Sequence, residues 1–285
     1  MEPHSQFVRV NGIRLHVADW GGSGPDLLLL HANGFLGWVY RKMIATLVGH
    51  YHVWTLDLRG QGDSEQPQLD ENHWSNMARD VEEVIAYFGF RDFYGIGHSG
   101  GGALLALYAA THPQRVNRLA LLEPVTMPHE PSFFARLSAD NHPFVERARR
   151  RRVVWEGRQQ LFEAYQGKEA FAAWDEDVLW DYVNHGTADL PDGGIALKCS
   201  GEVEAHVFAH TMTIDIFSQL TNVDCPVLVL RGALTDMPLF LVAERVAQKI
   251  PQGSLVTVAD TSHFLAMEKP EEVAEIIASY FQAAE

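Results

Sequence analysis

The residues Gly97, His98, Ser99, Gly100 and Gly101 form a G-x-S-x-G pattern between an apolar run and a helix-forming run. A serine at such a strand-to-helix turn has a strained backbone that lifts its hydroxyl above the sheet, and side chains at the flanking glycines would collide with neighbouring backbone. The amide of Gly100 then begins a helix and faces the place where an oxyanion would develop. The pattern predicts Ser99 as a nucleophile, with His98 on the opposite side of the chain in a packing role.

A serine hydroxyl is a poor nucleophile at neutral pH and needs a base that is itself oriented by an acid. His263 stands in the segment Asp-Thr-Ser-His-Phe, after the last apolar run and just before the final helix-forming run. This loop lies at the sheet edge where Ser99 is expected, and the chain order of serine, acid and histidine suits this arrangement. Of the fourteen histidines, we therefore predict His263 as the base.

Two carboxylates compete for the role of the acid. Asp236 lies four residues past Gly232, in a loop that can reach His263, and is the first choice. Glu123 ends a neighbouring apolar run, so that its carboxylate could reach the same histidine. Asp260 is too close in sequence to His263 for that role.

A second oxyanion donor is expected after the apolar run at 26–31. The turn His-Ala-Asn-Gly-Phe that follows places the backbone amide of Asn33 where it can act together with that of Gly100. The imidazole of His31 is expected to hold this turn through backbone hydrogen bonds rather than to take part in catalysis.

The elements that must position these residues alternate along the chain. A hairpin is predicted around Asn11-Gly12, because Asn-Gly between two alternating runs is the two-residue hairpin signal. Short, continuous apolar runs separated by helical patterns are typical of a buried parallel sheet. Strands are expected at 26–31, 51–57, 92–97, 116–123, 225–232 and 254–260, and helices at 38–48, 74–88, 100–112, 239–249 and 270–281.

The alternation of apolar runs with helical patterns stops after Pro124 for almost a hundred residues. This interruption predicts a mainly helical cap inserted into the core. The expected division is a core of residues 1–124 and 221–285 and a cap of residues 125–220, with helical segments near 132–138, 144–155, 159–165 and 176–184. Its aromatic side chains could roof an apolar pocket; they are Trp155, Phe162, Tyr165, Phe171, Trp174, Trp180 and Tyr182.

Composition narrows the class of protein. A length of 285 residues with 47% hydrophobic and 21% charged residues is typical of a globular chain with a sizeable core. The formal charge of −15 argues against nucleic acid as a partner. With two cysteines, no signal peptide and no apolar run long enough for a membrane span, we expect a cytoplasmic protein. The sequence leaves the oligomeric state open, a homo-oligomer included.

Four segments together make the chain resemble the α/β-hydrolase superfamily over almost its whole length: HANGF at 31–35, DLRGQGDS at 57–64, GHSGGG at 97–102 and DTSH at 260–263. The resemblance implies a mostly parallel eight-stranded sheet with helices on both faces and a cap after strand six. It also implies a triad of Ser99, Asp236 and His263, and a structural role for the DLRGQGDS loop. The usual His-Gly pair of the oxyanion loop is His31-Ala32 here.

A serine nucleophile sets aside the dehalogenase and epoxide-hydrolase branches of that superfamily, which resemble this chain elsewhere but attack with aspartate. The expected activity is hydrolysis of carboxylic esters, lactones included, of small to medium hydrophobic substrates through an acyl-enzyme on Ser99. Two alternatives on the same triad are a carbon-carbon bond hydrolase and a cofactor-free perhydrolase. A non-enzymatic alternative is a ligand-binding, receptor-like member of the fold.

No cofactor and no metal are expected to be needed for this chemistry. Glu202, Glu204, His206 and His210 lie near one another in sequence, and the two histidines could share a helix face as metal ligands. The chain has no HExxH motif, however, and the triad explains catalysis without an ion. A run of basic residues is typical of a solvated helix face: Arg147, Arg149, Arg150, Arg151 and Arg152.

Overall fold

The structure is a computed structural model that describes residues 1–126, 143–211, 213–236 and 239–283. The chain begins with a hairpin of β1 (His4–Val10) and β2 (Ile13–Gly21), in which Val10 pairs with Ile13. Asn11 and Gly12 have φ angles of 45° and 77°, the positive values that a two-residue type I′ turn requires. The predicted hairpin is confirmed.

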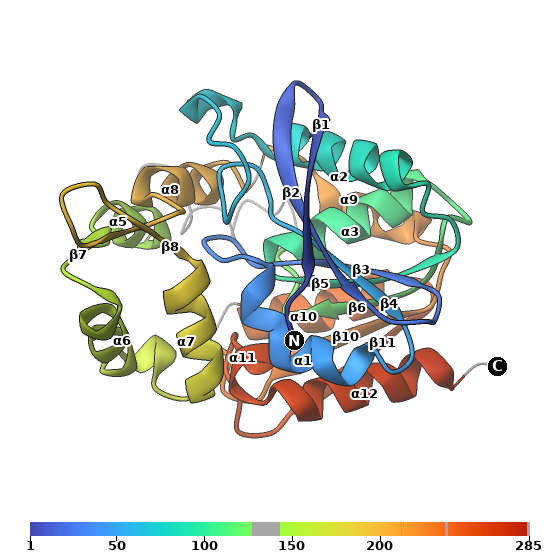
Figure 1. The fold of residues 1–285 in the computed structure, drawn as a ribbon. Coiled ribbons are helices and arrows are strands. Elements are labelled where there is room, and N and C mark those ends of the chain that lie inside the picture. Colours follow the sequence, from blue (N-terminus) through green and yellow to red (C-terminus); the bar gives the residue numbers. More distant parts are fainter. Residues whose placement is uncertain (127–142, 212, 237–238, 284–285) are drawn as a thin grey trace.

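The central sheet has eight strands in the order β1-β2-β4-β3-β5-β6-β10-β11. Strand β2 is antiparallel to both of its neighbours, β1 and β4, and all other neighbouring strands are parallel. The remaining strands are β3 (Asp26–Leu30), β4 (His52–Leu56), β5 (Phe93–His98), β6 (Val116–Leu122), β10 (Val227–Gly232) and β11 (Gly253–Val258). Because helices cover both faces, the central strands are apolar on both sides, as Leu27 to Leu30 show by being fully buried. The predicted mostly parallel sheet is confirmed (Figure 1).

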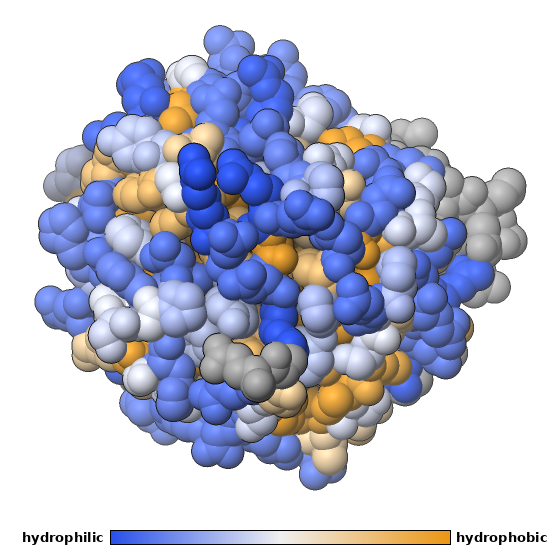
Figure 2. Space-filling view, turned by 90° about the vertical axis from the view of Figure 1, so that its right-hand side faces the viewer, coloured by the Kyte–Doolittle hydropathy of each residue, from blue (hydrophilic) through white to orange (hydrophobic). Residues whose placement is uncertain are grey.

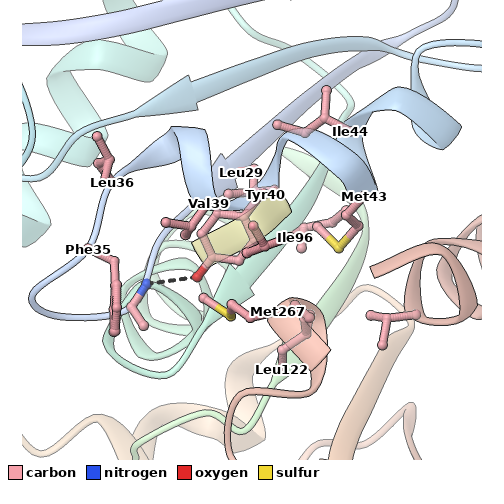
Figure 3. Packing of buried hydrophobic residues seen from close by; sticks show 14 of the residues in the cluster. Leu29, Phe35, Leu36, Val39, Tyr40, Met43, Ile44, Ile96, Leu122 and Met267 are labelled. Carbon is pink, nitrogen blue, oxygen red and sulfur yellow. Dashed lines mark hydrogen bonds between the residues drawn. The ribbon is translucent and has the colours of Figure 1, made fainter. Parts of the chain in front are cut away.

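Helices pack on both faces of this sheet (Figure 1). One face is covered by α1 (Arg41–Leu47), α11 (Leu265–Glu268) and α12 (Pro270–Gln282), and the other by α2 (Trp74–Phe88), α3 (Gly100–Thr111) and α10 (Leu239–Lys249). The 3-10 turn η1 (Gly37–Tyr40) leads into α1, and η2 (Leu69–Glu71) precedes α2. Figure 3 shows the first of these layers, where the hydroxyl of the buried Tyr40 accepts a hydrogen bond from the Ala32 amide at 3.1 Å.

An insertion follows β6, and we call its residues 143–209 the cap segment. It contains α5 (Pro143–Arg149), β7 (Val154–Trp155), α6 (Arg158–Gln166), η3 (Glu169–Phe171), α7 (Glu176–His185), β8 (Thr187–Asp189), β9 (Ile195–Leu197) and α8 (Gly201–Ala209). The helices expected near 159–165 and 176–184 are present, whereas the helix expected over 144–155 ends at Arg149. The helix expected near 132–138 lies outside the described residues.

Two features of the insertion differ from the expected helical cap. Strands β7, β9 and β8 form a small antiparallel sheet, so that Trp155 lies on a strand rather than on a helix. After the cap segment come α9 (Ile216–Gln219) and η4 (Leu220–Asn222), and the buried side chains of Ile216 and Leu220 pack in the same core cluster as α3.

The loop after β4 has a structural role that depends on Asp57. One oxygen of this buried carboxylate accepts from the Gly37 amide at 2.9 Å, and the other accepts from His16 Nδ1 at 2.8 Å and from the Asp63 amide at 3.0 Å. Burial opposes a charge on His16, but Asp57 raises the pKa of His16 above its ordinary value. Through these hydrogen bonds, the loop after β4 is fixed to His16 on β2 and to Gly37 of η1.

Replacing Asp57 with alanine should lower the free energy of unfolding by about 3 kcal/mol, because it leaves His16 and two amides buried without their acceptor. Urea denaturation followed by circular dichroism measures this loss. The exposed Glu275 on α12 provides a matched control, and Glu275→Ala should change stability by less than about 0.5 kcal/mol. Equal stabilities of the two variants would contradict a structural role for Asp57.

Hydrophilic residues cover most of the face seen in Figure 2, with hydrophobic residues visible between them. None of the helices in the described part of the chain is long and apolar enough to cross a membrane.

Candidate active site

Ser99 lies at the turn between β5 and α3 with a φ of 54° and a ψ of −113°. Positive φ is strained for a residue with a side chain and is found where the surrounding structure enforces it. Here the Ser99 amide donates to the Leu122 carbonyl at 2.8 Å, while its carbonyl accepts from the amides of Ala103 and Val125 at 3.1 and 3.2 Å. These bonds hold the backbone in the conformation that the G-x-S-x-G pattern predicts.

The glycines of the motif are required by close backbone contacts. A Cβ atom added to Gly97 would come within 2.6 Å of the Gly101 carbonyl oxygen, and one added to Gly101 would come within 2.4 Å of the Leu30 carbonyl oxygen. Both contacts are with backbone, which cannot move aside as a flexible side chain would. The start of α3 therefore packs directly on β5 and on the end of β3.

Two backbone amides are available as oxyanion donors. Strands β3 and β5 are parallel, and Leu30 pairs with Gly97. Asn33 comes three residues after Leu30, and Gly100 comes three residues after Gly97, so both lie at the same edge of the sheet. Among the hydrogen bonds of the described residues, neither of these two amides has an acceptor. The next amide, that of Gly34, donates to Gln61 Oε1 at 2.6 Å and fixes the loop.

His31 holds the same loop from inside the core. Its Nδ1 donates to the Ala32 carbonyl at 2.8 Å, and its Nε2 accepts from the Leu58 amide at 2.9 Å. The ring is fully buried, and this burial lowers the pKa of His31. Both ring nitrogens are used by backbone partners, as expected for a structural histidine.

His263 lies on the loop after β11, and its Nδ1 faces the carboxylate of Glu123. The Oε2 atom of Glu123 is 3.7 Å from His263 Nδ1, which is buried and has no closer partner among the described residues. The other oxygen, Oε1, accepts from the Gly232 amide at 2.7 Å and from the Thr235 hydroxyl. Glu123 is 3% exposed and has a φ of 46°, a second strained residue at this sheet edge.

Asp236, the first choice for the acid from sequence, is exposed. Within the described residues, no oxygen of Asp236 comes within 4 Å of a His263 ring nitrogen, whereas Glu123 does. The structure thus brings Glu123 to the histidine and does not bring Asp236 there. The physical reason is that Thr235, one residue earlier, turns inward and donates to Glu123, while the chain at 236 faces solvent.

An aromatic cluster lies between the oxyanion loop and the base. Phe35 of that loop contacts Trp174, Tyr182 and Phe264, with ring centroids 5.4, 5.3 and 5.8 Å away. Phe264 is the residue after His263, and Trp174 and Tyr182 belong to the cap segment. Aromatic side chains therefore connect the loop of Asn33 with the loop of His263 and with the cap segment.

The cap segment also makes polar contacts with the oxyanion loop. Asn33 Nδ2 donates to the Glu204 carbonyl on α8 at 3.2 Å. The Glu204 carboxylate pairs with Arg151, which also donates to the Tyr182 hydroxyl at 2.6 Å. Arg151 is therefore largely buried, whereas the sequence predicted a solvated side chain. The other arginines of the run are exposed, as predicted: Arg147, Arg149, Arg150 and Arg152.

The family model for the alpha/beta hydrolase fold matches residues 25–270, which is most of the chain. This chain belongs to the α/β-hydrolase family. It is 25% identical to the pimeloyl-[acyl-carrier protein] methyl ester esterase of Aeromonas hydrophila over 259 residues, covering 90% of this chain and 95% of that protein. It is 35% identical to the soluble epoxide hydrolase of a Corynebacterium species over 114 residues, covering 40% of this chain and 39% of that protein.

The similarity to solved structures extends over almost the whole chain. The structure of E-2-(acetamidomethylene)succinate hydrolase superposes with a TM-score of 0.83 at 21% identity, covering 99% of this chain and 100% of that one. The matches to several curated relatives, an epoxide hydrolase and a fluoroacetate dehalogenase among them, span less than half of those proteins.

The residue that sequence reasoning underestimated in this hydrolase is His98. Its Nε2 donates to the His263 carbonyl at 2.9 Å, which requires the proton on Nε2, and its Nδ1 then accepts from the Tyr40 hydroxyl at 2.8 Å. Tyr40 in turn accepts from the Ala32 amide (Figure 3). A buried chain of hydrogen bonds thus links the oxyanion loop to the backbone of the base. The two contacts of His98, with Tyr40 and with the His263 carbonyl, join distant segments, so the sequence carries no local signal for them.

The buried histidines make the stability of the hydrolase depend on pH. Burial, and then the neighbouring His263, hold the pKa of His98 well below its ordinary value, and burial lowers that of His31. In the unfolded chain both protonate near pH 6.5. The unfolded state therefore binds more protons as the pH falls below 6.5, and stability decreases there.

We expect each of these two histidines to reduce the free energy of unfolding by about 1.4 kcal/mol per pH unit below about pH 6.5, down to its folded pKa. Urea denaturation between about pH 5.5 and 7.5 measures the slope, in a range above the ordinary pKa values of carboxylates. His98→Gln should reduce the slope by about 1.4 kcal/mol per pH unit, which is the contribution of one proton. A slope unchanged by this substitution would show that His98 does not titrate on unfolding.

Proposed function

We propose that this chain is a serine hydrolase that cleaves carboxylic esters, lactones included, through an acyl-enzyme on Ser99. The observation that carries this proposal is the arrangement at one sheet edge. A strained serine stands beside the amides of Asn33 and Gly100, which have no acceptor among the described residues. His263 on a neighbouring loop faces a buried carboxylate.

In the proposed mechanism, His263 Nε2 takes the proton of Ser99 Oγ while Oγ attacks the acyl carbon. The negative charge that develops on the carbonyl oxygen is stabilised by hydrogen bonds from the amides of Asn33 and Gly100. Collapse of this intermediate breaks the ester bond, and the alcohol leaves with the proton from His263. Water, deprotonated by the same histidine, then cleaves the acyl-enzyme and restores Ser99. In the structure, Ser99 and His263 are not joined by a hydrogen bond, and such contacts commonly tighten only when substrate is bound.

Glu123 is proposed as the positioning acid. Its Oε1 is held by the Gly232 amide and the Thr235 hydroxyl, which leaves Oε2 directed at His263 Nδ1. A carboxylate in this place keeps the proton on Nδ1, so that Nε2 carries the lone pair that attacks the serine proton. It also stabilises the imidazolium that forms during each proton transfer.

Ester chemistry is supported by the residue types at the site. A relative with broad coverage is named as a methyl ester esterase, whereas the match to the epoxide hydrolase covers 40% of this chain. Position 99 holds serine rather than the aspartate with which the epoxide-hydrolase branch attacks. The aromatic contacts of Phe35 favour small to medium hydrophobic acyl or alcohol groups.

The test is a substrate panel that contains p-nitrophenyl esters of increasing acyl length, lactones, a dienone for carbon-carbon cleavage and peracetic-acid formation. We expect multiple turnovers on esters or lactones at rates above those of the other two reactions. Exclusive carbon-carbon cleavage or perhydrolysis would contradict the ester assignment while keeping the nucleophile. Tight retention of a ligand without turnover of any substrate would contradict an enzymatic role.

A further inference from the structure

Three histidines meet where the cap segment lies against the core, outside the Ser99 site. His73 immediately precedes α2, His206 lies on α8, and His210 follows the end of α8. The ring nitrogens that they offer lie within 4.8 Å of one another. The ring centroids of His206 and His210 are 4.0 Å apart, and those of His73 and His210 are 4.7 Å apart. The sequence indicated His206 and His210, with Glu202 and Glu204 nearby, but not His73, which comes from a distant part of the chain.

The hydrogen bonds of this cluster leave lone pairs free to bind a ligand. His210 Nδ1 donates to the His206 carbonyl at 2.8 Å, so that the proton is on Nδ1 and Nε2 carries the lone pair. A metal-binding histidine commonly donates its other ring N–H to a backbone carbonyl in this way. The Nε2 atom of His206 is buried and has no hydrogen-bond partner among the described residues.

Further polar atoms without partners lie next to the cluster. Asn72, the residue before His73, is fully buried, and within the described part of the chain neither its side-chain amide nitrogen nor its side-chain oxygen has a hydrogen-bond partner. On the other side of His73, Trp74 Nε1 donates to the Val207 carbonyl on α8 at 3.0 Å. The junction of α8 with the start of α2 is thus held in place by Trp74 but leaves buried polar groups unsatisfied, which is unusual in a native protein.

A second cluster with suitable donors, His16, Asp57 and Asp63, does not share these features. Both oxygens of Asp57 already accept hydrogen bonds from His16 or from backbone amides. This cluster is satisfied by the protein itself and needs no ion.

We propose that His73, His206 and His210 bind a divalent cation of the zinc class, which fastens α8 of the cap segment to the start of α2. Three imidazole nitrogens suit zinc and its neighbours nickel, copper and cobalt, and water completes the tetrahedron. With Zn–N bonds of about 2.0–2.1 Å, tetrahedral ligand nitrogens lie about 3.3 Å apart, so the nitrogens, which lie within 4.8 Å of one another, would have to move closer together when the ion binds.

The proposed ion lies close to the catalytic elbow without belonging to it. Trp74, next to His73, has its Cη2 atom 3.3 Å from the position that a Cβ on Gly100 would occupy. The same indole donates to Val207 on α8. An ion bound by His73 and α8 would therefore fix a side chain that lies next to Gly100, the residue whose amide is proposed as an oxyanion donor.

The test uses the full chain after treatment with a chelator, and Zn²⁺ alone as the probe in isothermal titration calorimetry. We expect one equivalent to bind, and His206→Gln, His210→Gln and His73→Gln each to weaken binding by at least about tenfold, since even the loss of outer-shell partners costs 10–100-fold. Co²⁺ in place of Zn²⁺ should give the visible absorption of tetrahedral nitrogen coordination. The exposed His50 provides a matched control, and His50→Gln should bind as the wild type does.

Circular dichroism identifies any variant that fails to fold, and the remaining single variants then decide the outcome. Zn²⁺ should also raise the melting temperature of the wild type but not that of the His73→Gln, His210→Gln double variant. Absence of saturable binding, or equal affinity of the wild type and all three single variants, would overturn the proposal. The second of these results would identify an adventitious site among the other histidines.

Discussion

Replacing Ser99 with alanine should reduce kcat/KM for ester hydrolysis by about 10⁴-fold or more while leaving the fold intact. The hydroxyl is the only group that this substitution removes, and no hydrogen bond of Ser99 Oγ to another described residue is lost. The backbone bonds that hold the turn, from the Ser99 amide to Leu122 and from Ala103 and Val125 to the Ser99 carbonyl, are all retained. Initial rates on the preferred ester of the substrate panel measure the effect.

Ser279, which is exposed on α12, provides the matched control. Ser279→Ala should keep the full rate, and urea denaturation of both variants should show stabilities close to that of the wild type. Retention of more than about a hundredth of the wild-type rate by folded Ser99→Ala would exclude Ser99 as the nucleophile, since removal of a catalytic nucleophile costs far more than this.

Replacing Glu123 with glutamine should lower kcat by about 10²–10⁴-fold, close to the effect of replacing the acid of a serine-protease triad with its amide. If the glutamine oxygen keeps the bonds from Gly232 and Thr235, its NH₂ group faces His263 Nδ1. Nδ1 must then accept rather than donate, and the proton moves to Nε2. In that tautomer His263 cannot take the proton of Ser99.

The matched comparison is Asp236→Asn. Because the Asp236 side chain is exposed and lies beyond 4 Å from the His263 ring nitrogens, we expect its kcat to change by less than about threefold, within the effect of an ordinary surface substitution. A large loss in Asp236→Asn together with near wild-type activity in Glu123→Gln would reverse the assignment and restore the acid first chosen from sequence. Steady-state kinetics on both variants therefore distinguishes the two carboxylates.

Much of the site could be predicted because its constraints are local in sequence. Gly97 is required by contacts with backbone only a few residues away, and any sequence that builds this turn must have a small residue there. The hairpin turn at Asn11-Gly12 is local in the same sense. The helix predicted over 74–88 agrees with α2 because its apolar residues follow one helical face.

The acid could not be chosen from sequence because β6 and β10 are neighbours in the sheet. Both strands end at the same edge, so that Glu123 and Asp236 each lie on a loop that could approach His263. The choice depends on the φ of 46° at Glu123 and on the hydrogen bond from Thr235, which are properties of the folded loops. A sequence pattern does not contain them.

The contacts of the cap segment were unpredictable for a related reason. Arg151 belongs to a run of arginines that is solvated at the other positions, and only its pairing with Glu204 and Tyr182 explains its burial. His73 meets α8 because α8 packs across the start of α2, an arrangement that depends on the insertion as a whole. Pairings between distant segments carry no periodic signal in the sequence.

The most direct test of the central claim, that Ser99 is the nucleophile of a hydrolase, is covalent labelling with a fluorophosphonate followed by mass spectrometry of the intact protein and its peptides. We predict one adduct per chain, located on Ser99, no adduct in Ser99→Ala, and slower labelling in Glu123→Gln because the base is then in the wrong tautomer. Labelling of a different residue, or equal labelling of wild type and Ser99→Ala, would contradict the account.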